Sequence, residues 1–265
     1  MNKFYIQTAL FLLSIFTYAN NEILATEPSP RKATTSKSNN HYPTSEEIYV
    51  KNKHLLCTNP EEIKNAEKLM NEAVGCLEYH ATSKNGYETL GENYISNAFY
   101  SKKKDQITEI FLKAKFKFED PSMYNALINM LWDPDSDSLF NNGSVKIARV
   151  YDPNLVIIQQ RYKKGFMSRQ KYFYALLKKA QVSKDKTIIV MASANINDHN
   201  PSKKTYKNKI IENANLFKTQ INSEDDIRKG KLKKVFVNIA GYLIENKFGW
   251  IDITYVESID GYTSF

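Results

Sequence analysis

From Ser144 to the C-terminus the chain is patterned almost entirely as β-strand, and this feature constrains the possible folds more than any other. Apolar runs of strand length alternate there with polar turns, which is typical of strands and hairpins. Runs such as Val156-Ile157-Ile158 are continuously apolar, which indicates a sheet buried on both faces. The strands that we expect span 145–151, 155–162, 172–180, 187–194, 234–245 and 250–259. The polar range 195–232 between them is expected to form an excursion around Ile210-Ile211.

The residues before Ser144 add helices and three further strands. Asn59-Pro60-Glu61-Glu62 combines a capping residue, a first-turn proline and acids at the positive end of the helix dipole, so it predicts a long helix. A short helix over 45–56 precedes it, and another helix starts at Asp120-Pro121 and ends at Trp132-Asp133-Pro134. The three strands are expected over 87–89, 94–100 and 107–118.

This order of elements predicts an α+β fold with one large antiparallel sheet, because helices and strands do not alternate as they do in parallel α/β folds. A sheet of about nine strands must be covered on at least one face, and one long helix covers little of it. We therefore expect the sheet to curl on itself or to enclose a cavity.

The N-terminus has the order of regions that marks a secretory signal peptide. Lys3 supplies a positive charge, a largely apolar run follows, and small residues for cleavage stand at Ala19 and Ala25. The residues after Ala25 show no apolar periodicity and read as a linker. The chain is therefore divided into a signal peptide (1–25), a flexible linker (26–44) and a folded domain (45–265). We expect a secreted protein, and a buried N-terminal helix is the alternative.

Cys57 and Cys76 bracket the long predicted helix. Nineteen helical residues at about 1.5 Å each separate the two by roughly 28 Å, which is far beyond the reach of a disulfide. We therefore predict two free thiols with a structural role. A metal pair or a catalytic dyad of Cys57 with His54 is the weaker alternative.

The sequence lacks the short motifs that carry common catalytic and cofactor chemistry. It contains no Gly-x-Gly, Gly-x-Ser-x-Gly, His-Glu-x-x-His or Cys-x-x-Cys, and its four histidines are scattered. Asp198-His199 and Glu224-Asp225-Asp226 are interpreted as parts of polar loops and turns rather than as a catalytic pair and a metal site. We predict no enzyme, no catalytic residue, no metal and no cofactor; hydrolysis of lipids by carboxylate chemistry is a weaker alternative.

The net charge of +8 is concentrated in two ranges. Residues 146–180 hold nine Lys and Arg against one acid, and residues 203–234 hold ten against four. Such fields attract anionic lipid headgroups at up to about 1 kcal/mol per cation near the surface, and they attract nucleic-acid phosphates equally. Because the leader predicts secretion, we expect anionic membrane and no nucleic acid as partners; a merely solvated surface is the alternative.

Five segments of the chain closely resemble the fam-a proteins of rodent malaria parasites. The segments are 42–49, 53–62, 66–73, 129–135 and 228–245, and the resemblance runs along essentially the whole chain. It implies a START-type lipid-transfer domain, in which a curved antiparallel sheet grips a long C-terminal helix around a tunnel for one lipid. It also implies export toward the host erythrocyte or the parasitophorous vacuole, and a phospholipid or fatty acid as ligand.

The resemblance also implies site residues at matching positions. Trp132-Asp133 resembles the Trp-Asp that ends the helix before the main sheet in START domains, and Tyr172 falls where one tyrosine of a choline cage is expected. Other positions of the phosphatidylcholine pattern are occupied here by Asn129, Ile158 and Asn238. Arg161 is a candidate phosphate contact on physical grounds, since a charge in a low-dielectric tunnel needs a partner. The residues assigned to the lipid cavity are Trp132, Asp133, Arg161, Tyr172, Tyr174 and Tyr255.

The C-terminus departs from the START pattern. Only six residues follow the last expected strand at Ile259, too few for the C-terminal grip helix, so we expect a truncated domain with an open tunnel. We expect a monomeric, START-like lipid carrier. The alternative is an exported host-interaction protein on the same scaffold that no longer binds lipid.

Overall fold

The structure of the chain is a computed structural model, which describes residues 42–93, 98–104, 110–136, 143–163, 168–202 and 206–260. The predicted signal peptide, most of the predicted linker and residues 261–265 lie outside these ranges. No helix within the described ranges is long and apolar enough to cross a membrane.

The helices begin where the sequence predicts them. The carboxamide oxygen of Asn59 accepts hydrogen bonds from the backbone N–H groups of Glu61 and Glu62 at 3.0 and 3.2 Å, which caps the long helix. Asp120 accepts from the N–H of Ser122 at 3.0 Å and so caps the 3-10 turn that leads directly into the later helix. The helices are α2 (Ser45–Lys51), α3 (Pro60–Thr82), α4 (Tyr124–Trp132) and α5 (Asp225–Arg228), with 3-10 turns η1 (Lys53–Leu55), η2 (Pro121–Met123) and η3 (Glu212–Asn215).

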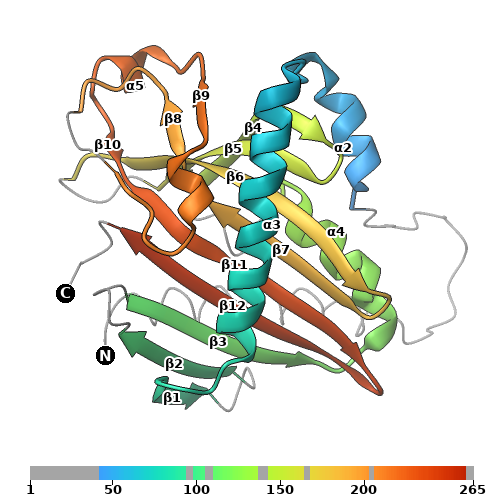
Figure 1. Cartoon of the computed structure of the whole chain (residues 1–265). Coiled ribbons are helices and arrows are strands. Elements are labelled where there is room, and N and C mark those ends of the chain that lie inside the picture. Colours follow the sequence, from blue (N-terminus) through green and yellow to red (C-terminus); the bar gives the residue numbers. More distant parts are fainter. Residues whose placement is uncertain are drawn as a thin grey trace, which may run out of the picture.

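Nine strands of the described residues form one continuous antiparallel sheet in the order β1-β2-β3-β12-β11-β7-β6-β5-β4 (Figure 1). Together with the helices, this sheet confirms the predicted α+β fold. The strands of the sheet are β1 (Glu88–Asn93), β2 (Ala98–Lys104), β3 (Ile110–Phe118), β4 (Gly143–Asp152), β5 (Leu155–Tyr162), β6 (Lys171–Ser183), β7 (Lys186–Ala192), β11 (Phe236–Lys247) and β12 (Trp250–Asp260).

The polar excursion after β7 contains short elements of its own. Strands β8 (Asn195–Asn197) and β9 (Lys218–Gln220) pair in parallel, and β10 (Lys233–Lys234) adds to β6 in parallel. Ile211 and Ile227 are fully buried and Phe217 is nearly so, which anchors the segment to the domain. The polar composition of the segment does not reveal this packing, because only a few of its residues are apolar.

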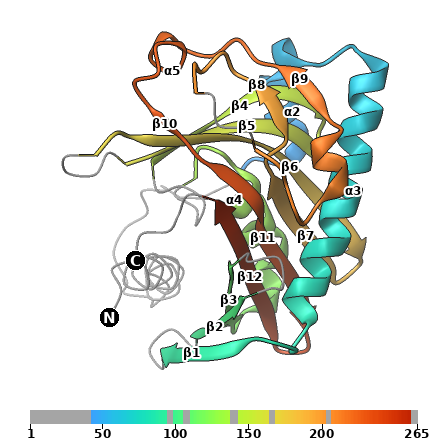
Figure 2. The same cartoon turned by 60° about the vertical axis from the view of Figure 1, so that its left-hand side comes forward.

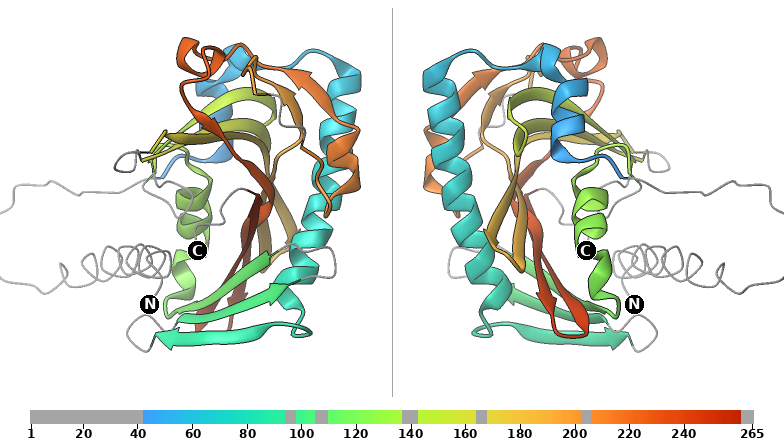
Figure 3. Two further views of the ribbon diagram at one scale, coloured as in Figure 1. Left: turned by 90° about the vertical axis from the view of Figure 1, so that its left-hand side faces the viewer. Right: turned by 90° about the vertical axis from the view of Figure 1, so that its right-hand side faces the viewer.

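The sheet is curved, and its two faces carry two separate cores. Helix α3 lies on the outer face and buries Leu69, Met70, Ala73 and Leu77 completely against it. Helix α4 lies inside the curve, on the opposite face (Figures 2 and 3). We call the face that carries α4 the concave face and the one that carries α3 the outer face. Because side chains of a strand alternate between faces, the strands from β3 through to β4 in the sheet order contribute to both cores.

The two cysteines are free thiols, as predicted. Cys57 lies just before α3 and Cys76 lies within its last two turns, so the helix holds them apart. Burial raises the pKa of both thiols, which lowers their reactivity and agrees with a structural role.

Candidate functional site

The concave face presents an apolar wall that spans the sheet from β3 to β5. Helix α4 packs on this wall with its apolar side, which ends at Trp132. The short helix α2 adds Ile48 to the same core. Residues of the wall on the central and later strands include Phe116, Ile253, Ala240, Tyr242, Ile189, Met191, Ala175, Leu177, Val156 and Ile158. The polar atoms of the strand backbones are used in the sheet ladders, so the wall consists chiefly of side-chain carbons.

An open pocket lies where α4 ends against strands β4 and β5. Its lining is apolar except at Asp133, and it consists of Leu131, Trp132, Asp133, Pro134, Val145, Ile147, Val156, Ile158 and Leu177. The indole Nε1 of Trp132 is buried there and has no hydrogen-bond partner among the described residues. Burial raises the pKa of the Asp133 carboxyl. The two residues that the resemblance assigned together, Trp132 and Asp133, therefore do line one hollow of the concave face.

A small polar cluster interrupts the wall near the end of β12. The hydroxyl of Tyr255 donates to Oε2 of Glu257 at 2.6 Å, and the Tyr255 ring lies 5.1 Å from that of Tyr242, centroid to centroid. Removal from water raises the pKa of the Glu257 carboxyl, and it raises those of the two tyrosines further above neutrality. We call Tyr242, Tyr255 and Glu257 the Tyr–Glu cluster.

Sequence reasoning found Tyr255 but missed Tyr242 and Glu257. The signal was present in β12, where Ile251, Ile253, Tyr255 and Glu257 alternate with polar or outer-face residues. An acid in the register of an apolar series belongs to the buried face of the strand. The pattern alone does not say whether that face is packed solid or faces a ligand.

The raised pKa of Glu257 leads to a pH-dependent prediction. The folded protein holds this proton more tightly than the unfolded chain, so the ionised carboxylate costs stability as the pH rises above the ordinary glutamate range. We expect Glu257→Gln to melt at a higher temperature than the wild type at pH 8. The difference should shrink toward pH 4, where the wild-type carboxyl is itself neutral. Tyr242 and Tyr255 stay protonated across this range.

Differential scanning calorimetry from pH 4 to pH 8 measures this difference. Glu119→Gln, which changes an exposed carboxyl, is the matched control and should show no such trend. A melting-temperature difference between Glu257→Gln and wild type that is constant over the whole pH range would contradict the raised pKa of Glu257.

Three of the six predicted site residues lie on the other face of the sheet. Arg161 pairs with Tyr172 across β5 and β6, and Gln159 pairs with Tyr174, so these four side chains share the outer face. The expectation that Arg161, Tyr172 and Tyr174 line one cavity with Trp132 and Tyr255 is therefore corrected. All of these residues except Trp132 and Asp133 do lie on strands of one sheet. The alternation of side chains along each strand, however, puts Arg161, Tyr172 and Tyr174 on the opposite face from Tyr255.

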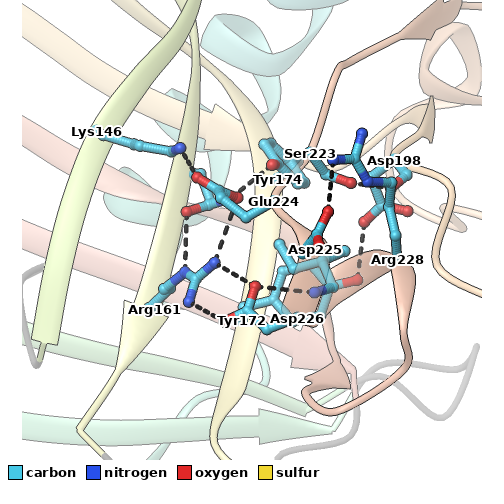
Figure 4. A network of polar contacts seen from close by, with 12 residues as sticks. Lys146, Arg161, Tyr172, Tyr174, Asp198, Ser223, Glu224, Asp225, Asp226 and Arg228 are labelled. Atoms are coloured by element: carbon cyan, nitrogen blue, oxygen red, sulfur yellow. Dashed lines mark hydrogen bonds and ion pairs between the residues drawn. The ribbon is translucent and has the colours of Figure 1, made fainter.

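On the outer face these residues hold the excursion between β7 and β11 (Figure 4). Arg161 donates both terminal nitrogens to Asp226, at 2.6 and 2.9 Å, and lies 3.2 Å from Glu224. Lys146 also pairs with Glu224. The Arg161 guanidinium lowers the pKa of the Asp226 carboxyl. We call Arg161, Glu224 and Asp226 the ionic latch.

A second set of contacts fastens the start of the same excursion. The hydroxyl of Tyr172 donates to Oδ2 of Asp198 at 2.8 Å, and Nζ of Lys234 donates to Oδ1 of the same carboxylate at 2.8 Å. Tyr174 accepts a hydrogen bond from the Gln159 amide at 2.5 Å. Arg161, the predicted phosphate contact, and Tyr172, the predicted cage tyrosine, thus bond to the carboxylates of Asp226 and Asp198 of this protein. Their role is structural.

Breaking the ionic latch should loosen the excursion locally. We expect Arg161→Met to speed amide hydrogen exchange in 222–231 by about tenfold, because Asp226 loses its bidentate partner and Glu224 loses a second cation beside Lys146. The global free energy of unfolding should fall by only about 1 kcal/mol, since these carboxylates are about one-third exposed. Hydrogen-exchange mass spectrometry resolves the effect. Lys51→Met, which removes an exposed ion pair to Asp135, should leave exchange in 222–231 unchanged.

The acids at 224–226 do not form a metal site with their neighbours. Within the part of the chain that the structure describes, no three His, Cys, Asp or Glu side chains are grouped as metal ligands. Ion pairs to Arg161, Lys146, Arg228 and Lys229 account for these acids instead.

Comparison with known proteins gives a structural likeness without a sequence relative. No protein-family model matches the chain, and no curated protein matches its sequence. Among solved structures, human StAR-related lipid transfer protein 5 is similar with a TM-score of 0.50 and 9% identity, over 74% of this chain and 82% of that one.

Two further human structures are similar over slightly less of this chain. STARD10 has a TM-score of 0.47 and 15% identity, over 72% of this chain and 68% of its own. The lipid transfer and protein localization domain of StarD13 has a TM-score of 0.45 and 16% identity, over 70% and 80%. The curved antiparallel sheet, its strand order and the likeness to StAR-related lipid transfer protein 5 give this chain a START-like α+β fold.

Proposed function

We propose that this protein binds one lipid molecule with its acyl part against the concave face, and that it transfers the lipid between membranes. The observation that carries the proposal is the apolar concave wall with an open pocket beside Trp132. Ligand sites are typically concave and mostly apolar, with few polar groups that fix orientation. The Tyr–Glu cluster supplies such groups on the same face. The solved structures with this fold include proteins named for lipid transfer, which supports the same function.

Burial of acyl chain is the driving force in this proposal. Each methylene moved from water to an apolar wall contributes about 0.8 kcal/mol. About ten methylenes then supply about 8 kcal/mol, which corresponds to roughly micromolar affinity before the cost of immobilising the lipid. This is a range in which a carrier both captures and releases its cargo.

The finer features of the proposal rest on the sequence. The fam-a resemblance and the predicted leader support secretion and export toward the host erythrocyte or the parasitophorous vacuole. Exposed lysines of the ranges 146–180 and 203–234, such as Lys163, Lys218 and Lys231, support docking on anionic membrane. Several other cations there are paired internally, so the charge available for docking is smaller than the sequence count suggests.

Lipid loading and transfer test the proposed function directly. The purified protein is incubated with liposomes of mixed neutral, zwitterionic and anionic lipids, re-isolated, and analysed by native mass spectrometry. We expect one lipid per chain, and transfer of that lipid to acceptor liposomes at a rate that depends on protein concentration. A protein that takes up no lipid would favour the host-interaction alternative, and phospholipid breakdown would favour a hydrolase.

A further inference from the structure

The Tyr–Glu cluster places an acid on a wall that is otherwise apolar. Glu257 lies on β12 in the same register as Ile251 and Ile253, and it faces the concave side with Tyr255. Its neighbours across the ladder are Leu112 on β3 and Ala240 on β11. The side chain is partly exposed, so a molecule that lies on the wall can reach it.

No cation within the described part of the chain neutralises this carboxyl. Among the residues that the structure describes, Glu257 has no salt-bridge partner, and the Tyr255 hydroxyl on Oε2 is its one hydrogen-bond donor. A carboxylate has two oxygens and accepts about four hydrogen bonds, so Oε1 keeps unused acceptor capacity. Lys179, whose ammonium lies on the same face, stands over the Trp132 ring instead, 5.8 Å from its centroid.

These facts disfavour a phosphate at the Tyr–Glu cluster. A phosphate against an unpaired carboxylate in an apolar setting meets a like charge, and both groups lose water without gaining a counter-ion. Arg161, the cation expected to hold a phosphate, is committed to Asp226 on the outer face. An uncharged hydrogen-bond donor on the lipid, in contrast, satisfies the free oxygen of Glu257. The donor and the carboxyl oxygen then bond to each other, whereas each alone would lose its hydrogen bonds to water without a replacement.

We propose that the lipid carried on the concave face has an uncharged polar end with a free hydroxyl, and that this hydroxyl donates to Glu257. This inference rests on the proposed lipid-binding function and narrows it to the hydroxyl-bearing neutral lipids. Glu257 is then the residue that sets headgroup specificity. Tyr255 is a positioning residue, because its hydroxyl holds Oε2 and leaves Oε1 turned toward the ligand.

A pair of lipids that differ in one hydroxyl tests this assignment. The probes are 1,2-dioleoylglycerol, its 3-O-methyl ether and the corresponding phosphatidic acid, which share the same acyl chains. Binding to the purified protein is measured by displacement of a fluorescent fatty alcohol. We expect the hydroxyl lipid to bind at least tenfold more tightly than the ether and more tightly than phosphatidic acid. In Glu257→Leu the ratio of hydroxyl to ether should fall to within about threefold.

The outcomes separate this inference from the proposed function. Equal binding of hydroxyl and ether by the wild type, or a preference for phosphatidic acid, overturns the inference and leaves lipid binding intact. Failure of all three lipids to bind overturns both. Should Glu257→Leu not fold, the wild-type ratio still decides the matter. Tyr255→Phe gives a second readout: we expect it to weaken the hydroxyl preference only in part, because Glu257 remains but loses the donor that holds Oε2. A loss as complete as in Glu257→Leu would shift the assignment from Glu257 to the tyrosine.

Discussion

Val145→Trp is expected to lower lipid binding about tenfold or more and to change the melting temperature little. Val145 lines the pocket beside Trp132, and it lies on the edge strand β4, where the added indole has room. A tryptophan there occupies space that the acyl chain would fill. If about two methylenes of the acyl chain are excluded from the pocket, the binding free energy weakens by roughly 1.6 kcal/mol. A change of about 1.4 kcal/mol corresponds to a tenfold change in affinity. Titration with a fluorescent fatty acyl probe measures the loss.

Ser144→Trp is the matched control for this substitution. Ser144 is the preceding residue on β4, it is exposed, and it pairs with Arg161 on the outer face. The same indole is thereby added to the same strand on the other side of the sheet. We expect lipid affinity close to that of the wild type. Equal loss of binding in both variants would mean that the pocket beside Trp132 is not where the acyl chain lies.

Gly241→Ala is expected to destabilise the folded protein by about 3 kcal/mol or more. A Cβ at Gly241 would lie 2.2 Å from the carbonyl oxygen of Ile189 and 2.8 Å from the Cα of Val190. Both are backbone atoms of the central strand β7, so neither can rotate away as the end of a side chain would. Domains of this kind are stable by about 5–15 kcal/mol, so the loss is a large share of the total. Urea unfolding followed by circular dichroism measures it.

Gly75→Ala, in contrast to Gly241→Ala, is expected to raise the free energy of unfolding. Gly75 lies inside α3, and a Cβ there would meet no atom within 4 Å. Alanine favours a helix interior over glycine by about 0.5–1 kcal/mol, so this variant should be more stable than the wild type. If Gly241→Ala were as stable as the wild type, the close approach of β11 and β7 that defines the centre of the sheet would be wrong.

The local patterns of the sequence were sufficient for most elements but not for their arrangement. The cap at Asn59 and the proline at 121 locate the starts of α3 and α4, because helix signals are local. β12 joins β11 in a local hairpin across Phe248-Gly249, but its place beside β3 has no local signal. It depends on pairing between residues more than a hundred positions apart, such as Tyr255 with Ala114, and only the packed structure decides it.

The site was predictable only in part, for a related reason. Alternation along β5 and β6 shows that Arg161 and Tyr172 share a face, but it does not say that α3 covers that face. A charged residue on a buried strand, such as Arg161, predicts a ligand contact when the sequence alone is known. The acids at 224 and 226, more than sixty residues away, turned out to be its partners. Trp132 lines the hollow beside α4, and its place at the end of that helix is a local feature that the sequence marks.

Photo-crosslinking tests the account most directly. The purified protein is loaded with one fatty acyl lipid that carries a diazirine in mid-chain, irradiated and mapped by peptide mass spectrometry. We expect saturable labels on concave-face residues of β5, β6 and β11, such as Ile158, Leu177 and Ala240. Saturable labels confined to α3 or to outer-face residues such as Tyr172 would contradict the claim that the lipid lies inside the curve of the sheet.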